Sequence, residues 1–427
     1  MKTLEIHPLD GPVDGEVRVP GSKSYTNRAL LIAALCDGQT TIDAALFSDD
    51  THHMAESLKQ LGIVVGSDPK NERFIVTGCG GRIPADRGDL YTGNSGTTTR
   101  FLTALLGLGQ GKYVIDGNER MRERPLKDLI DGLTPLGVEI SSANGDGCPP
   151  ITIRAKGLTG GRTFMPGDKS SQYFTALMLV GAYAEADTEI RVRGELLSKP
   201  YIDMTTDIMS RFGIDVERDG YNMFRIRSGQ RYRAQPYTVE PDATNATYFF
   251  AAAAVTSGRV LVRNLSLESA QGDVKFVHVL EKMGCDVSAT EEGIVVQGPE
   301  ILSGIDIDMN GMPDAAQTLA AIAPFSDSPV TIRNVPNMRI KETDRIDAMA
   351  AELTKLGVKV DVWADGLRIH PTEVFVPAAL DTYDDHRMAM SLSLIGLRAD
   401  GVVINDPDCV NKTFPAFFET LAKIRPE

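Results

Sequence analysis

Six short segments place a small or acidic residue at the start of an Ala- or Leu-rich stretch. Their marker residues are Ser24, Gly96, Ser170, Asp242, Asp314 and Asp385. Residues of these types are frequent where helices begin, and a helix start presents free N–H groups and a positive dipole end. Capping alone would explain any single segment. Six together indicate a protein that binds anions at helix N-termini.

Cationic side chains occur at or near these helix starts. They are Lys23, Arg28, Arg100, Arg124, Lys341, Arg345, Arg387 and Lys412. Arg suits carboxylate and phosphate ligands because its planar guanidinium binds two oxygens at once. The chain as a whole is acidic, with 58 Asp and Glu against 44 Lys and Arg and a net charge of -14. Cations concentrated at helix starts in an acidic chain predict a small polyanionic substrate.

The composition argues against several other classes of protein. An acidic chain lacks the basic surface that nucleic acid or an anionic membrane would need, and no apolar run approaches the roughly 18 residues of a membrane span. The five cysteines form no Cys-x-x-Cys pair, and no His-Glu-x-x-His motif occurs. We therefore expect free thiols and neither a metal nor a cofactor. The first residues lack the apolar segment of a signal peptide, which predicts a cytoplasmic protein.

The spacing of the markers indicates an internal repeat. Successive markers lie 72, 74, 72, 72 and 71 residues apart. Between them, helix-like apolar stripes end at Gly62, Gly137, Gly213, Gly284 and Gly357, and two strand-like segments follow each glycine. A glycine directly after an apolar stripe is typical of a helix C-terminus. The sequence predicts six units of about 72 residues, each with the element order βαβαββ.

The repeat also predicts two domains of α/β class. Three units form a first domain over 21–240, and the other three form a second domain over 241–427 together with 1–20. The N-terminal segment belongs there because the sixth unit lacks its final strand pair, and residues 4–20 read as strand, turn and strand. Two facing domains would direct several helix starts toward one cleft, where we expect the active site.

Eight motifs resemble those of the 5-enolpyruvylshikimate-3-phosphate (EPSP) synthase family. They are PGSKSYTNRALLIAAL, GNSGTTTR, ERMRERP, DKSSQY, SKPYID, RIKETDR, YDDHRMAM and NKTFPAFF. The resemblance runs from about residue 5 to about residue 424. It implies a transferase of the shikimate pathway, which leads to chorismate and the aromatic amino acids. It also implies the enolpyruvyl transferase fold, with two domains that each assemble three βαβαββ units in pseudo-threefold symmetry.

The reaction implied by the resemblance moves the enolpyruvyl group of phosphoenolpyruvate to the 5-hydroxyl of shikimate 3-phosphate by addition and elimination, releasing phosphate. Matched motif by motif, the residues expected to bind shikimate 3-phosphate are Lys23, Ser24, Arg28, Ser170, Ser171, Gln172, Ser198, Tyr201, Asp314, Asn337 and Lys341. Those expected to bind phosphoenolpyruvate are Lys23, Asn94, Gly96, Arg124, Gln172, Arg345, Arg387 and Lys412. The expected catalytic residues are Asp314, Glu342, Lys23 and His386.

The chemistry assigns different tasks to these catalytic groups. Asp314 would take the proton that the 5-hydroxyl loses when it attacks C2 of phosphoenolpyruvate. Glu342, or alternatively Lys23, would give C3 a proton and later reclaim it. Nearby carboxylates would also stabilise a transition state that resembles an oxocarbenium cation.

Two residues depart from the pattern common in glyphosate-sensitive members, NAGTxxRP. Ser95 replaces the alanine and Phe101 replaces the proline. The sequence therefore leaves open how strongly the inhibitor glyphosate acts, although glyphosate is expected to bind.

We expect the protein to be a monomer.

Three alternatives share part of the pattern. UDP-N-acetylglucosamine enolpyruvyl transferases commonly carry a reactive Cys, sometimes Asp, in the loop that here reads GNERMRERP. This loop contains no Cys, which argues against that enzyme. RNA 3'-terminal phosphate cyclases have a related repeat, but an acidic chain without a nucleotide motif argues against them. A non-catalytic anion-binding protein is disfavoured because Lys23, Asp314, Glu342, Arg345 and Arg387 are all present.

Overall fold

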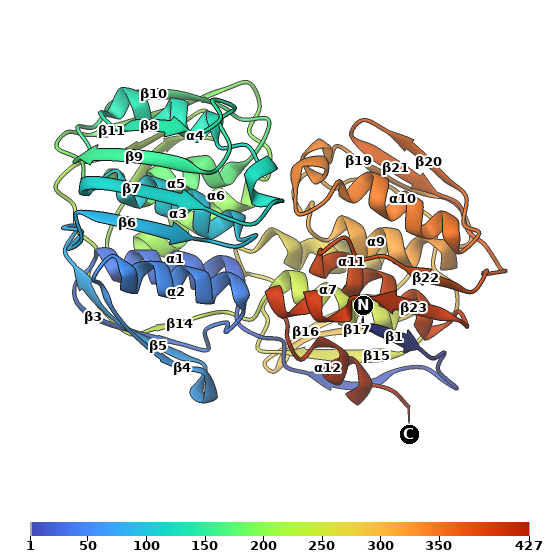
Figure 1. The fold of residues 1–427 in the computed structure, drawn as a ribbon. Helices are drawn as coiled ribbons and strands as arrows, with labels where there is room; N and C mark the ends of the chain where they lie inside the picture. Colours follow the sequence, from blue (N-terminus) through green and yellow to red (C-terminus); the bar gives the residue numbers. More distant parts are fainter. Residues whose placement is uncertain (1, 427) are drawn as a thin grey trace. The chain divides into compact units, whose positions relative to one another are not determined.

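The chain forms two compact units. The computed structural model describes residues 2–426 (Figure 1); the outermost residues of the predicted second domain, 1 and 427, lie outside this range. The N-terminal unit is Gly21–Glu240, and the C-terminal unit joins Met1–Pro20 to Pro241–Glu427. The chain passes from one to the other at Pro20 and again at Glu240.

The N-terminal unit contains three four-stranded sheets, ordered β14-β3-β5-β4, β6-β7-β9-β8 and β10-β11-β13-β12. In each sheet the first two strands pair in parallel and the others pair antiparallel. The strands are β3 (Asp37–Asp43), β4 (Val64–Asp68), β5 (Arg73–Cys79), β6 (Arg87–Tyr91), β7 (Gln110–Asp116), β8 (Glu139–Ser142), β9 (Ile151–Lys156), β10 (Gly161–Pro166), β11 (Thr188–Arg193), β12 (Val216–Asp219), β13 (Met223–Ile226) and β14 (Tyr237–Thr238). The helices are α1 (Lys23–Leu35), α2 (Asp49–Gln60), α3 (Gly96–Leu106), α4 (Lys127–Leu133), α5 (Ser171–Gly181) and α6 (Pro200–Arg211).

The C-terminal unit has a similar plan, with two four-stranded sheets ordered β16-β17-β15-β2 and β18-β19-β21-β20 and one three-stranded sheet ordered β1-β23-β22. The strands are β1 (Thr3–Ile6), β2 (Asp14–Val17), β15 (Arg259–Arg263), β16 (Asp286–Thr290), β17 (Gly293–Gln297), β18 (Asp306–Asp308), β19 (Val330–Arg333), β20 (Val360–Trp363), β21 (Gly366–Ile369), β22 (Ala378–Leu380) and β23 (Val402–Asn405). The helices are α7 (Ala243–Val255), α8 (Phe276–Lys282), α9 (Ala316–Ile322), α10 (Arg345–Lys355), α11 (His386–Ser393) and α12 (Phe417–Lys423). The order βαβαββ is therefore confirmed, most plainly from β18 to β21.

The Ala- and Leu-rich helices form the interior of each unit. In the N-terminal unit α3 contacts α1 and α5, and in the C-terminal unit α9 contacts α7 and α11. Every residue of α3, α7, α9 and α11 is buried. A helix that is apolar around its whole circumference must be enclosed by other elements. The sheets and the amphipathic helices supply that enclosure, so the inner helices are fixed supports for the residues at their N-termini.

The five predicted helix-stop glycines all adopt left-handed backbone, with φ between 83° and 101°. At Gly137, φ is 93° and an added Cβ would lie 2.8 Å from the Thr159 side chain. A side chain there would be strained by both the backbone and its neighbour. The glycines therefore end the outer helix of each repeat and turn the chain toward its strand pair.

The N-terminal segment corrects one prediction. Residues 4–20 were expected to supply both missing strands of the sixth unit. Only β1 does so, by pairing antiparallel with β23. Strand β2 instead pairs in parallel with β15, in the sheet of the fourth unit. The fourth unit needs this strand because the chain enters it directly at α7, without a leading strand of its own.

No helix within residues 2–426 has the length and apolar character required to cross a membrane.

Candidate active site

A buried ion-pair network in the C-terminal unit is centred on Arg345, the first residue of α10. Its guanidinium donates to Asp385 from Nε at 2.7 Å, to Asp314 at 3.0 Å and to Glu342 at 2.8 Å. Arg345 is 1% exposed. Burial lowers its pKa, but the charges of Asp385, Glu342 and Asp314 outweigh that effect, so the pKa lies above its ordinary value. Arg345 therefore remains a cation and holds three carboxylates around one point.

Asp314 receives cationic side chains on both of its carboxylate oxygens. Oδ1 lies 3.0 Å from Arg345 and 3.5 Å from the Lys341 ammonium, while Oδ2 accepts from Arg387 at 3.0 Å. Asp314 was also considered as a simple helix cap. The N-cap of α9 is Ala315, so the carboxylate is committed to the cations instead.

Lys412 extends the network to Glu342. Its ammonium lies 3.3 Å from Glu342 Oε1, opposite the oxygen that faces Arg345. Both side chains are only 8% exposed. We call Lys341, Arg345, Arg387 and Lys412 the cationic cluster. It surrounds Asp314 and Glu342 with more positive than negative charge, an arrangement suited to an anionic ligand.

The start of α11 places Asp385 and the predicted residue His386 beside this cluster. Asp385 is the N-cap and accepts from the Arg387 backbone N–H at 2.9 Å. The His386 ring is buried, with Nδ1 3.5 Å from Asp385 Oδ1. Arg387 also reaches Tyr248 Oη at 3.4 Å, and burial raises the pKa of Tyr248 to about 12. His386 therefore lies against Asp385, the residue that orients Arg345.

Arg28 is a buried cation of the N-terminal unit whose described partners are all uncharged oxygens. Its guanidinium donates to Thr205 Oγ1 at 3.0 Å, to the Tyr201 carbonyl at 3.1 Å and to the Ser24 carbonyl at 2.9 Å. The Phe101 ring centroid lies 5.5 Å from the guanidinium carbon. Burial lowers the pKa of Arg28 to about 10, so it remains charged at neutral pH. Because no carboxylate among the described residues compensates this buried charge, an anionic ligand would be a favourable partner for it.

Gly96, the first residue of α3, lies under two guanidinium groups. A Cβ at this position would be 2.7 Å from a nitrogen of Arg100 and 2.7 Å from a nitrogen of Arg124. Arg124 also donates to the Asn94 carbonyl at 3.1 Å, and Arg100 donates to Gln172 Oε1 at 2.7 Å. Any larger residue would displace both cations. The helix start and its two cations therefore form a second arrangement suited to an anion.

The remaining predicted residues of this unit lie at neighbouring helix starts. Lys23 begins α1, with its ammonium 3.7 Å from Asp50 Oδ2. Ser170 caps α5 by accepting the Gln172 backbone N–H at 3.3 Å, and Ser171 is the first residue of that helix. Ser198 is buried in left-handed backbone at φ 56°, just before α6. Non-glycine residues in this conformation cluster at functional sites, since the strain must be held by their surroundings.

The predicted site residues thus form two groups. The group in the C-terminal unit contains Asp314, Asn337, Lys341, Glu342, Arg345, His386, Arg387 and Lys412, and the rest belong to the N-terminal unit. Sequence reasoning assigned no site role to Asp385, although it marked a helix start two residues before the cationic Arg387. It also left Arg100 unassigned and gave no sign of Asp50 or Asp273, because the burial of these carboxylates beside cations depends on the tertiary fold.

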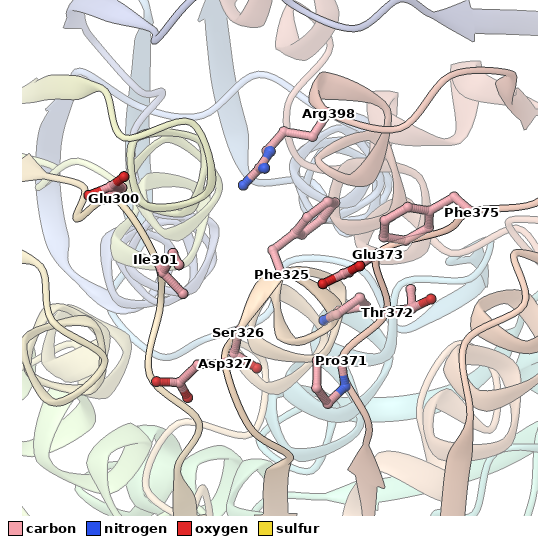
Figure 2. Close-up of a pocket in the computed structure, with 11 residues that line it drawn as sticks. Glu300, Ile301, Phe325, Ser326, Asp327, Pro371, Thr372, Glu373, Phe375 and Arg398 are labelled. Carbon is pink, nitrogen blue, oxygen red and sulfur yellow. The ribbon is translucent and has the colours of Figure 1, made fainter.

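A surface pocket elsewhere in the C-terminal unit contains none of the predicted residues. It has a volume of about 590 Å³, and Figure 2 shows Arg398 near Phe325 and Phe375 at its centre. The two rings lie 5.1 Å apart, and the Arg398 guanidinium lies 5.2 Å from the Phe325 centroid. Glu300, Asp327 and Glu373 also line it. Three carboxylates against one guanidinium disfavour a phosphorylated ligand, so this pocket is unlike the cationic cluster.

Comparison with known proteins shows the family to which the chain belongs. The EPSP synthase (3-phosphoshikimate 1-carboxyvinyltransferase) family model matches residues 9–421. A 3-phosphoshikimate 1-carboxyvinyltransferase of Trichormus variabilis is 50% identical over 424 residues, covering 99% of this chain and 99% of the relative. The corresponding protein of Shewanella denitrificans is 46% identical over 429 residues and covers 100% of both chains.

Solved structures agree on the fold. An EPSP synthase structure from Acinetobacter baumannii aligns with a TM-score of 0.84 at 24% identity, covering 100% of this chain and 98% of that one. The predicted enolpyruvyl transferase fold is thereby confirmed, and the family match decides against the three alternatives considered from the sequence. The chain belongs to the EPSP synthase family, and it transfers the enolpyruvyl group of phosphoenolpyruvate to the 5-hydroxyl of shikimate 3-phosphate in the shikimate pathway.

Proposed function

We propose that three members of the cationic cluster, Arg345, Arg387 and Lys412, bind phosphoenolpyruvate. The observation that carries this proposal is the position of four cations around Asp314 and Glu342, with Arg345 and Arg387 both buried. Phosphoenolpyruvate has a carboxylate and a phosphate, the two groups that guanidinium binds in bidentate fashion. The residues assigned to this substrate are Arg345, Arg387 and Lys412 of the cluster, with Lys23, Asn94, Gly96, Arg124 and Gln172 of the N-terminal unit.

Shikimate 3-phosphate is assigned mainly to the N-terminal unit. Arg28 supports this role because a buried guanidinium bonded only to uncharged oxygens can receive the shikimate carboxylate as its counterion. Hydroxyls at the start of α5 and the strained Ser198 would donate to the phosphate. The full assignment is Lys23, Ser24, Arg28, Ser170, Ser171, Gln172, Ser198 and Tyr201, with Asp314, Asn337 and Lys341 of the C-terminal unit.

Asp314 is the proposed base for the 5-hydroxyl. The hydroxyl oxygen forms a bond to C2 of phosphoenolpyruvate as its proton passes to the Asp314 carboxylate, and C3 gains a proton. C3 then loses a proton while the C2–O bond to phosphate breaks. Glu342 is the proposed donor and acceptor at C3, with Lys23 as the alternative. Each positioned proton transfer contributes about 10²–10⁴-fold to the rate.

His386 receives a different role from the one predicted. It was expected among the catalytic residues, yet its Nδ1 faces Asp385 at 3.5 Å. We assign it to positioning, because a ring held against Asp385 restricts the carboxylate that orients Arg345.

Three further properties belong to the same proposal. Glyphosate would occupy the phosphoenolpyruvate site and inhibit competitively with that substrate. The chain would act as a monomer in the cytoplasm, and its five free cysteines support a reducing compartment. Inhibition kinetics at several phosphoenolpyruvate concentrations test the first property, and light scattering in solution tests the second.

Two variants test the division of substrates. Arg387→Met is expected to raise KM for phosphoenolpyruvate by about tenfold or more, with affinity for shikimate 3-phosphate changed less than about threefold. Arg28→Met is expected to weaken shikimate 3-phosphate in calorimetry and to leave KM for phosphoenolpyruvate nearly unchanged. If the two variants show the opposite pattern, or if neither affects its assigned substrate, the assignment is wrong.

A further inference from the structure

Glu352 is a fully buried carboxylate of α10 that the proposed chemistry does not use. Its side chain is 0% exposed and accepts hydrogen bonds at both oxygens. Oε2 accepts from the Asp381 backbone N–H at 2.9 Å and faces the Lys355 ammonium at 2.8 Å. Oε1 accepts from Tyr383 Oη at 2.5 Å. A buried carboxylate with three donors is a strong tether between the elements it joins.

These bonds hold one end of the segment Asp381–Asp385, which leads into α11. Lys355 adds a second contact at that end, 2.7 Å from Asp381 Oδ2. The other end is held by Arg345, which binds the Asp385 carboxylate. Arg345 and Glu352 are two turns apart on the same helix, about 10 Å along its axis. The segment is therefore attached to α10 at both of its ends.

The middle of this segment has unusual backbone. Tyr383 and Asp384 are consecutive non-glycine residues in left-handed conformation, with φ of 56° and 53°. L-residues avoid this region, and it persists only where surrounding contacts fix it. Burial and the Glu352 hydrogen bond raise the pKa of Tyr383 to about 12, so its hydroxyl stays protonated and continues to donate at neutral pH.

We propose that Glu352 is a positioning residue that fixes the Asp381–Asp385 segment and, through it, the Arg345–Asp385 pair and Arg387. The proposal rests on the assignment of Arg345 and Arg387 to phosphoenolpyruvate. Without Glu352 the strained segment relaxes, and Asp385 no longer fixes the orientation of the Arg345 guanidinium. Arg387, two residues after Asp385, then moves away from Asp314. The loss falls on phosphoenolpyruvate rather than on shikimate 3-phosphate, whose main contacts are assigned to the other unit.

Three substitutions grade the effect. Glu352→Ala removes all three bonds and is expected to raise KM for phosphoenolpyruvate at least about tenfold, with shikimate 3-phosphate affinity within about threefold of wild type. Tyr383→Phe removes one bond from a half-exposed ring and should raise the same KM about two- to fivefold. Glu352→Gln should recover most of the loss, because its amide oxygen still accepts from Asp381 while its NH₂ group can donate to the Tyr383 hydroxyl.

Two controls separate positioning from lost stability. Leu353→Ala, at the next residue of α10, empties a buried site of the hydrophobic core and removes no hydrogen bond to the segment, because a leucine side chain forms none. It is expected to lower the melting temperature and to leave KM for phosphoenolpyruvate unchanged. In the double variant Glu352→Ala with Arg387→Met, the two effects should overlap, so that KM is close to that of Arg387→Met alone.

The outcomes are distinguishable. If Arg387→Met weakens phosphoenolpyruvate but Glu352→Ala and Tyr383→Phe do not, Glu352 has no positioning role and the substrate assignment stands. If Arg387→Met itself leaves KM for phosphoenolpyruvate unchanged, the assignment of Arg387 to phosphoenolpyruvate is wrong, and the positioning role that rests on it is wrong as well. Fully multiplied effects in the double variant, or an equal rise in KM for Leu353→Ala, would also overturn the proposal.

Discussion

Arg345 and Asp385 form a two-point ion pair that is almost completely removed from solvent. Nε of Arg345 lies 2.7 Å from one carboxylate oxygen, and a terminal nitrogen lies 3.2 Å from the other. The side chains are 1% and 0% exposed. The pair joins the start of α10 to the start of α11, so one buried ion pair holds these two helix N-termini together.

Arg345→Lys tests this support. A single ammonium cannot reproduce the fork that joins Asp385, Asp314 and Glu342, so buried carboxylates lose their partner. We expect the free energy of unfolding to fall by about 3–5 kcal/mol in urea titrations, together with most of the activity. Arg333→Lys is the control, because its pair with Asp306 is more than half exposed and should contribute about 1 kcal/mol or less. Equal losses from the two variants would contradict the buried network.

Phe101→Leu tests the ring beneath Arg28. The Phe101 ring centroid lies 5.5 Å from the carbon of a desolvated guanidinium, and such a contact contributes about 2 kcal/mol. Leu fills part of the space but has no π system. We expect affinity for shikimate 3-phosphate to fall about tenfold in calorimetry, since about 1.4 kcal/mol corresponds to a factor of ten. Phe212→Leu, a buried substitution beside Tyr237, should leave that affinity unchanged; an equal loss there would assign the effect to general destabilisation.

Asp273 predicts a pH dependence of stability. It is buried on a 3₁₀ turn that contacts α7, and Thr244 donates to its Oδ2 at 2.7 Å. Burial, followed by the charges of Asp314 and Asp242, raises its pKa from 3.8 to about 7, although Arg387 opposes the shift. Because the folded state binds this proton more tightly, the associated stability is fully present below the unfolded pKa near 4 and is lost as the pH rises through about 7.

Asp273→Asn removes that titration while keeping the shape of the side chain. The variant should gain at least about 1 kcal/mol relative to wild type between pH 5 and pH 8, since one pKa unit corresponds to 1.36 kcal/mol. Urea titrations at several pH values measure the difference. Asp400→Asn, at an exposed turn residue, controls for the loss of one negative charge. A gap between Asp273→Asn and wild type that stays constant with pH would contradict the shifted pKa.

The repeat and its helix boundaries could be predicted from the sequence because their signals are local. A glycine after an apolar stripe requires left-handed backbone wherever the helix packs, and Gly62 and Gly284 behave accordingly. The motifs also identified both groups of charged residues. The positions of Ser170 and Asp385 as helix caps follow from the same short-range rules.

Strand partners and buried charges could not be predicted in this way. Strands β1 and β2 have similar patterns, and only the unpaired sheet edges decide that one joins β23 and the other β15. Asp385 pairs with an arginine 40 residues earlier, and no local pattern specifies that partner. Asp273 lies in an unremarkable Gly-Asp turn whose burial depends on α7. Long-range packing determines each of these features.

Asp314 is the residue on which the account of the chemistry depends. Its carboxylate is held by Arg345, Arg387 and Lys341, and the proposal makes it the base for the 5-hydroxyl. Asn has the same shape and accepts hydrogen bonds through its oxygen, but it cannot take up a proton at neutral pH.

The most direct measurement is therefore kcat of Asp314→Asn by phosphate release, beside the calorimetric affinity for shikimate 3-phosphate. We predict that kcat falls about 10²–10⁴-fold, equivalent to roughly 3–5 kcal/mol of barrier, while the affinity stays within about threefold of wild type. Turnover within a few-fold of wild type would contradict this prediction and leave Glu342 and Lys23 to carry both proton transfers.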